Sequence, residues 1–187
     1  SYGAAVSADV LAAPGATCSQ PEGEQVPCIL GSGGGLALRG GYRSASGWYA
    51  GGAYQLSKTD SGNLYRLATM QQLRAEMRYA FDLGYRTSPY ATWGLGAVLY
   101  GNEFGVETGG GSGYFGVGFE QQISHIASFG MALVYQPVVF APFTDTAAFE
   151  RSAGLAQFVH LELNIEIRSE LSRGELSTGK SVYRGWW

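Results

Sequence analysis

Charged residues are scarce in this chain of 187 residues: they make up 14% of it, where a soluble domain usually has about a quarter. No run of about 20 consecutive apolar residues occurs, which excludes a membrane-spanning helix. The formal net charge is −3 and the chain has no basic stripe, so we expect no nucleic-acid partner. What the chain does have is glycine, with 29 residues, and an aromatic fraction of 13%.

Cysteine is nearly absent: Cys18 and Cys28 lie together in a segment rich in Pro, Gly and Glu. A structural zinc site needs four ligands, so we predict no metal site, and we find no cofactor motif. A disulfide that closes a short loop is the better interpretation, with two free thiols as the alternative. A disulfide implies an oxidising compartment, and the chain begins at Ser1 without a signal-like segment, so we expect a mature exported protein.

Alternation of apolar and polar residues with a period of two is the dominant pattern. From Leu67 to Phe81, Leu, Met and aromatic residues alternate with Gln, Arg and Glu, although the composition also permits a helix over 64–81. The same alternation runs from Leu155 to Arg168. In all, it predicts eight strands, near 2–12, 36–43, 48–56, 67–81, 92–99, 115–120, 128–135 and 155–168.

The connections between these strands alternate in length. Long ones are expected near 14–32, 58–64, 102–112 and 137–152, and short ones near 45–47, 83–88 and 123–126. An up-and-down outer-membrane barrel has long loops outside and tight turns in the periplasm. An even strand number returns the chain to its starting side, so both termini are expected in the periplasm. We therefore predict a barrel over 1–169 and a periplasmic tail over 170–187.

Residue size indicates which face of each strand points inward. The charged faces also carry Gly35, Gly41, Gly94, Gly96, Gly116, Gly118 and Gly130. An eight-stranded barrel has little room inside, so long Arg and Glu side chains need very small neighbours there. A soluble calyx with the opposite orientation should expose many lysines, and only Lys58 and Lys180 occur. We expect the apolar face to meet lipid, with girdles formed by Trp48, Tyr79, Phe81, Tyr90, Trp93, Tyr100 and Tyr114.

The pattern resembles the small outer-membrane barrels of the OmpA and OmpX type. The Gly-rich run from Gly31 to Tyr42 and the segment from Trp48 to Tyr54 are similar to hairpin sequences of such barrels. The resemblance covers residues 1–169 and implies an all-β, eight-stranded antiparallel transmembrane barrel in the bacterial outer membrane. One feature departs from it: such barrels commonly end on an aromatic residue, whereas here the last strand fades near Arg168.

The inward charges form the main constellation of candidate site residues. They are Arg39, Arg43, Arg74, Glu76, Arg78, Glu120, His160, Glu162 and Glu166. Buried charges are tolerated only when they are paired and hydrogen-bonded, so we predict an ion-pair network that plugs the lumen and sets strand register. A narrow ion path or gate is the functional alternative.

Catalysis receives little support from the sequence. His160 beside Glu162 would need a serine to complete a lipid-hydrolase triad. His160 is predicted to face inward, His125 lies in a predicted turn, and neither has a serine at a recognisable spacing. We therefore predict a barrel that is not an enzyme, with a lipid-modifying enzyme as an alternative.

The ends of the barrel offer the candidate interaction surfaces. The disulfide-stapled loop 14–32 and the loop 137–152 would suit a cell-surface adhesin, and the alternative for the stapled loop is that the disulfide protects it against proteases. The tail ends in Val182, Tyr183, Arg184, Trp186 and Trp187, which are good anchors for a pocket on a partner. The alternative is that the tail packs on its own barrel or on the membrane interface. We predict a structural anchor or interaction partner that contacts outer-membrane lipid and a protein in the periplasm or the membrane.

Overall fold

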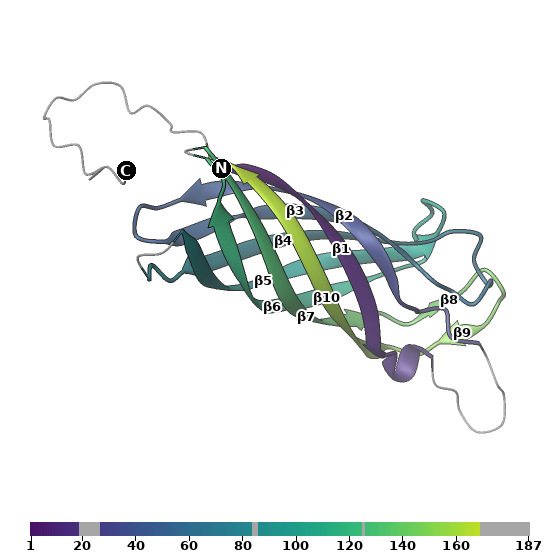
Figure 1. The fold of residues 1–187 in the computed structure, drawn as a ribbon. Helices are drawn as coiled ribbons and strands as arrows, with labels where there is room; N and C mark the ends of the chain where they lie inside the picture. The colour runs from purple at the N-terminus through teal and green to yellow at the C-terminus, as the bar shows by residue number, and fades with distance from the viewer. Residues whose placement is uncertain (19–26, 84–85, 125, 169–187) are drawn as a thin grey trace, which may run out of the picture.

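The computed structural model of this chain describes residues 1–18, 27–83, 86–124 and 126–168, and eight long strands in it close into one barrel (Figure 1). The strands are β1 (Tyr2–Ala13), β2 (Gly33–Arg43), β3 (Trp48–Thr59), β4 (Ala68–Ala80), β5 (Thr87–Asn102), β6 (Thr108–Gln122), β7 (Ala127–Phe140) and β10 (Gly154–Ile167). Their order around the barrel is β1-β10-β7-β6-β5-β4-β3-β2, and all neighbours are antiparallel. The predicted fold class is confirmed.

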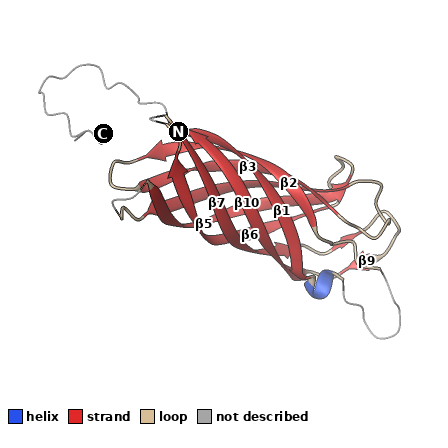
Figure 2. Ribbon diagram, viewed as in Figure 1, coloured by secondary structure: helices blue, strands red, loops and turns tan. Residues whose placement is uncertain are grey.

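Secondary structure outside the barrel wall is sparse. A two-stranded sheet joins β8 (Phe143–Thr144) to β9 (Glu150–Arg151), and η1 (Gly15–Thr17) is a single helical turn (Figure 2). Among the described residues, no helix is long and apolar enough to cross a membrane. The barrel wall therefore determines the shape of the described molecule.

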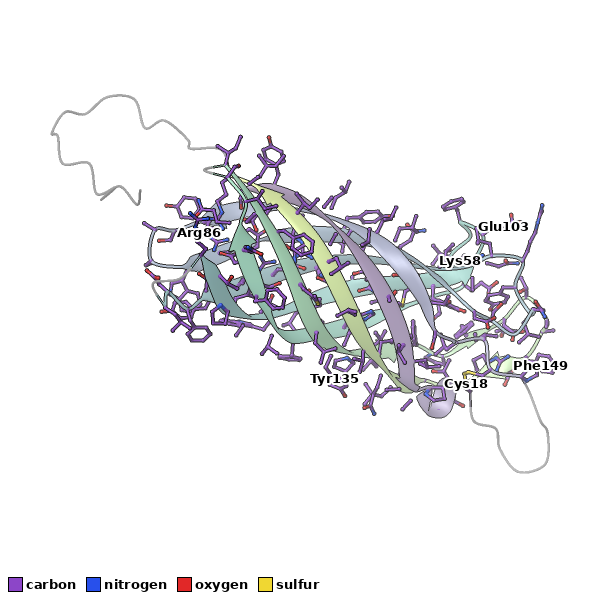
Figure 3. The ribbon with its side chains drawn as sticks, in the orientation of Figure 1. Cys18, Lys58, Arg86, Glu103, Tyr135 and Phe149 are labelled. Carbon is purple, nitrogen blue, oxygen red and sulfur yellow. A yellow bond between two sulfur atoms is a disulfide. The ribbon has the colours of Figure 1, made fainter. Side chains whose placement is uncertain are left out.

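The two ends of the barrel differ, and we call them the turn end and the loop end. The turn end has the connections 44–47, 81–86 and 123–126, and both Ser1 and the last described residue, Arg168, lie there (Figure 1). The loop end has the connections 14–32, 60–67, 103–107 and 141–153. Figure 3 shows Arg86 at the turn end and Cys18, Lys58, Glu103 and Phe149 at the loop end.

Three expectations about elements need correction. The helix alternative over 64–81 is wrong, because β4 pairs with β3 and β5 along its whole length. The loop expected at 102–112 shrinks to 103–107, because Gly109 to Gly111 lie within β6 and pair with β5. Glycine is unfavourable in an isolated strand, but two neighbouring strands supply the backbone hydrogen bonds here. The loop expected at 137–152 also shortens, since β7 continues to Phe140.

Side chains alternate between the lumen and the outside as predicted. Leu38 and Leu95 are 67% and 71% exposed on the outer face, while Arg39 and Arg74 are buried. Three of the expected girdle residues, Tyr90, Tyr100 and Tyr114, are instead buried in the lumen, which corrects the prediction. Residues that are an even number of positions apart on one strand point to the same face. Each of these tyrosines has this spacing from an inward-facing residue of its own strand, so it points inward as well. Trp48, Tyr79, Phe81 and Trp93 do cluster near the turn end, with centroid distances of 4.9–5.8 Å.

Candidate functional site

Glu162 lies at the centre of the charged residues in the lumen. Its carboxylate accepts hydrogen bonds from Arg39 Nη2 at 2.9 Å, Arg74 Nη2 at 3.1 Å and the Tyr114 hydroxyl at 2.9 Å. Arg74 also donates through Nε to Glu76 at 2.5 Å. These groups come from β2, β4, β6 and β10, so the cluster ties opposite walls of the barrel together.

A second cluster lies nearer the turn end. Arg43 donates to Glu120 and also to Glu166, at 3.4 Å in the latter case. Arg78 donates to Glu166 at 3.3 Å, and Arg168 donates to Glu120 at 3.0 Å. Each carboxylate is thus shared between two guanidinium groups, which is the arrangement that makes buried charge tolerable.

His160 is separate from both clusters. Its Nδ1 lies 2.6 Å from Asp9 Oδ1, and both residues are buried. His160 Nε2 is also buried and has no hydrogen-bond partner within the described part of the chain. A catalytic triad would need a serine hydroxyl at this nitrogen. The geometry therefore provides an Asp–His pair without a nucleophile.

Glycines make room for large side chains in the lumen, and tyrosine rings stack on the arginines there. A Cβ on Gly96 would lie 2.8 Å from the Arg74 Cβ, and one on Gly118 would lie 2.8 Å from the Tyr90 ring. The guanidinium of Arg74 lies 4.1 Å from the Tyr114 ring centroid, and that of Arg78 lies 4.4 Å from the Tyr90 centroid. These cation–π contacts explain why tyrosines occupy lumen positions.

An apolar cluster, which we call the loop plug, lies in the barrel near the loop end. It consists of Ile29, Leu30, Tyr65, Ala68, Met70, Val98, Tyr100, Val138, Phe140, Ala156 and Phe158. Ile29 belongs to the connection 14–32 and is fully buried, and its carbonyl accepts a hydrogen bond from the Tyr100 hydroxyl at 2.5 Å. Part of the first loop therefore enters the barrel mouth.

Covalent and ionic contacts hold the loops at the loop end together. A disulfide joins Cys18 to Cys28 directly before the plug residue Ile29, and both half-cystines pack against the loop plug. Arg151 forms a buried pair with Asp145 at 2.8 Å and donates to the Pro27 carbonyl at 3.2 Å. These contacts link the first loop (14–32) to the fourth loop (141–153).

Tyr65 extends this arrangement to the third loop, because its hydroxyl donates to Glu107. Burial and this hydrogen bond raise the pKa of Tyr65 above its ordinary value. A tyrosine hydroxyl is protonated at physiological pH in any case, and the raised pKa extends its role as a donor to more alkaline conditions. The second and third loops are joined through this contact.

The structure places all nine of the predicted charges in the lumen, but in two clusters and one Asp–His pair. Sequence reasoning missed Asp9, Arg168 and Tyr114 as members. Alternation would have found each of them: Asp9 lies between the outward positions of Val10 and Ala8 on β1, Arg168 is two residues after Glu166, and Tyr114 is six residues before Glu120. The tail residues Val182, Tyr183, Arg184, Trp186 and Trp187, and also His125, lie outside the described residues.

No known protein family and no curated protein sequence matches this chain. Several solved structures do. Neisserial surface protein A is 12% identical, with 89% of this chain and 93% of that chain covered and a TM-score of 0.58. OprG from Pseudomonas aeruginosa is 14% identical, with coverages of 89% and 93% and a TM-score of 0.53. The outer membrane enzyme PagL is 10% identical, with coverages of 87% and 97% and a TM-score of 0.50. At these identities the comparison concerns the fold alone: this chain has the fold of the small eight-stranded outer-membrane barrels.

Proposed function

We propose that this chain is a non-conducting, non-enzymatic barrel of the bacterial outer membrane that serves as a structural anchor or interaction partner. The observation that carries the proposal is the filled lumen. Ion pairs around Glu162 and Glu166 occupy its middle and its turn end, and the loop plug occupies its loop end. A barrel whose lumen is occupied in this way by the described side chains is expected to act through its outer surface and its two ends.

Conductance across a planar bilayer tests the first half of the proposal. The purified chain should give no stable current steps, while a general porin in the same membrane gives them. A double variant, Ile29→Gly with Met70→Gly, removes two of the apolar side chains of the plug and should stay closed, because the Arg and Glu clusters remain below. Stable steps from the unmodified chain would refute a filled lumen.

Co-purification tests the second half, in which the tail 170–187 docks on a periplasmic or membrane protein. The full chain and a variant ending at Ser169 should be purified from native membranes in mild detergent. A partner that is captured by the full chain and lost from the truncated one supports docking by the tail. A matched variant, Trp186→Ala with Trp187→Ala, should lose the partner as well, because aromatic anchors carry much of the energy of such interfaces. The same complex from all three chains contradicts the role of the tail.

A surface adhesin is the second candidate, and the linked loop end favours it. Loops held by the Cys18–Cys28 disulfide and by the Arg151 contact to Pro27 lose less entropy on binding than free loops do. If the loop end binds a surface ligand, Cys18→Ser with Cys28→Ser should weaken the binding of whole cells to that ligand, while the barrel itself still folds. Ligand binding that is kept by the chain ending at Ser169 but lost in the cysteine variant would favour an adhesin over docking by the tail.

A lipid-modifying enzyme is the least supported function. The pair of Asp9 and His160 faces the lumen, away from any lipid substrate, and no serine of the described residues lies at hydrogen-bond distance from His160 Nε2. We expect no hydrolysis of labelled outer-membrane lipid by the purified chain. Hydrolysis that is lost in His160→Gln would overturn this part of the proposal.

A further inference from the structure

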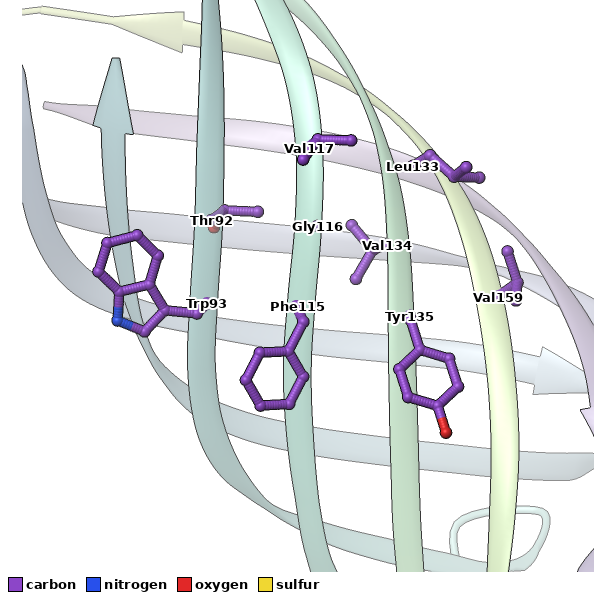
Figure 4. A pocket seen from close by; sticks show the side chains of 9 residues that line it. All are labelled: Thr92, Trp93, Phe115, Gly116, Val117, Leu133, Val134, Tyr135 and Val159. Atoms are coloured by element: carbon purple, nitrogen blue, oxygen red, sulfur yellow. The ribbon is translucent and has the colours of Figure 1, made fainter. Parts of the chain in front are cut away.

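The outer wall of the barrel has a shallow apolar groove where β5, β6, β7 and β10 lie side by side. Its volume is about 590 Å³ (Figure 4). Its rims are formed by Trp93, Phe115, Tyr135 and Val159 on one side and by Val117 and Leu133 on the other. Its floor is the strand backbone at Gly116 and its neighbours Thr92 and Val134, whose side chains are buried in the lumen.

Strand register explains why the groove has two rims. Trp93 pairs with Phe115, Phe115 with Tyr135 and Tyr135 with Val159, which makes one row across four strands. Val117 pairs with Leu133 in the next outward row. Rows on one face are two residues apart along each strand, which is roughly 6–7 Å.

The aromatic rings lean away from the second row and so open the groove. The Phe115 ring lies over Gly113, where an added Cβ would be 2.9 Å from it. The Tyr135 hydroxyl donates to Gln157 at 2.9 Å, and Gln157 pairs with Pro137, in the direction away from Leu133. Figure 4 shows the rings of Phe115 and Tyr135 pointing away from Val117 and Leu133, with the Trp93 indole beside them at the end of the row. A bare glycine and a glutamine tether therefore maintain the width of the groove.

The groove offers an occupant only apolar contacts. The Thr92 hydroxyl is already bonded to the Met77 carbonyl at 3.1 Å, and that of Tyr135 is bonded to Gln157. The Trp93 end of the groove lies towards the turn end, where Trp93 packs against Trp48, but Phe115 is the central residue of β6 (Thr108–Gln122), so in a bilayer the part of the groove around Phe115 lies near the middle of the hydrocarbon layer. Lipid headgroups are excluded at that depth.

The size of the groove distinguishes between the remaining candidate occupants. A stable protein interface uses about 20–30 residues on each side, whereas nine residues line this groove. A second copy or a partner protein would need far more surface. A single hydrocarbon chain needs only a narrow furrow, and walls on two sides give it more dispersion contacts than a smooth barrel surface does.

We propose that this groove holds one acyl chain of an outer-membrane lipid in preference to the lipid around the rest of the barrel. The inference goes beyond the proposed function and requires only that the barrel spans the membrane. Neither a partner protein nor a closed lumen is needed for it, so its failure and the failure of the proposed function are separate outcomes.

Trp93 on the rim of the groove is a built-in reporter. In a chain with Trp48, Trp186 and Trp187 changed to Phe, Trp93 is the remaining tryptophan. Its fluorescence should be recorded in vesicles of unlabelled phosphatidylcholine that contain a small, increasing fraction of a fatty acid brominated in the middle of its chain, so that occupancy of the groove by the probe depends on the preference of the groove for a single acyl chain. The comparison chain carries Trp93→Phe and Val6→Trp, which moves the reporter to the outward face of β1, away from the groove.

If the groove prefers a single acyl chain, half-maximal quenching of Trp93 should occur at a severalfold lower fraction of brominated fatty acid than half-maximal quenching of the Val6→Trp reporter. Val117→Phe fills the groove and should abolish this difference, whereas Leu38→Phe on the outward face of β2 should leave it intact. Equal quenching of the two reporters overturns the proposal, and so does a difference that survives Val117→Phe. The reporter comparison decides alone if Val117→Phe does not fold.

Discussion

At the scale of single residues, Glu162 is the group on which the lumen depends most. Its carboxylate holds Arg39, Arg74 and the Tyr114 hydroxyl at once, inside a wall that admits little water. Among the described residues, Glu162→Gln removes the one carboxylate with which Arg39 pairs and leaves Arg74 with Glu76 alone. Breaking a buried pair in this way costs roughly 3–5 kcal/mol. We expect a loss of that size in the free energy of unfolding, measured with urea in lipid vesicles.

The exposed pair of Arg66 and Glu103 at the loop end is the matched control for Glu162→Gln. Both side chains are more than half exposed. Because solvent screens such a pair, Glu103→Gln should change the free energy of unfolding by less than about 1 kcal/mol. Similar small effects from both variants would show that the lumen pairs are hydrated and weak.

Individual lumen residues were largely predictable, and their pairing was not. A period of two places Arg74 and Glu162 on inward faces without any tertiary information. Which groups meet depends on the stagger between strands, and Arg39 and Glu162 are 123 positions apart in sequence. Tyr90 and Tyr114 were misplaced for a different reason. Their type suggested the membrane interface, but parity fixed them inside, opposite the arginines that they stack on.

At the scale of elements, β10 gives a direct test of which face meets lipid. Leu155 and Leu163 lie on its outward face, the first close to the loop end and the second well inside the strand. Leu163→Arg should cost roughly 2–4 kcal/mol of folding free energy in vesicles, because arginine near the bilayer midplane is poorly solvated. Leu155→Arg should cost about 0–1 kcal/mol, as expected near the interface. Equal costs at both positions would contradict a membrane-spanning β10.

Strands with clear alternation were predicted well, whereas strands rich in glycine were predicted to be shorter than they are. For β4, the alternation in the sequence outweighed its helix-forming composition, because both strand neighbours satisfy its backbone. For β6, Gly109, Gly110 and Gly111 carry no side-chain signal at all, so its first residues looked like a loop. The small sheet of β8 and β9 was missed, because its hairpin is organised by the Asp145 carboxylate, which accepts from Ala147 and Phe149.

At the scale of the whole molecule, the filling of the barrel changes along its axis. Shared ion pairs around Glu120 and Glu166 lie towards the turn end, the Glu162 cluster lies in the middle, and the apolar loop plug lies towards the loop end. Between the last two, Gln136 donates to Gln72 across the lumen at 2.5 Å. A single contiguous filling of this kind couples all eight strands, so unfolding should be cooperative.

The same asymmetry predicts the orientation of the barrel in the membrane. Eight strands bring the first and last described residues to one end, and that end has the shorter turns. Outer-membrane barrels place short turns in the periplasm and longer loops outside. An epitope inserted between Thr146 and Ala147, in the turn that joins β8 to β9, should bind antibody on intact cells. An epitope placed after Trp187 should bind only after the outer membrane is permeabilised. The reverse pattern would require long loops in the periplasm and would reverse the assignment of both interaction surfaces.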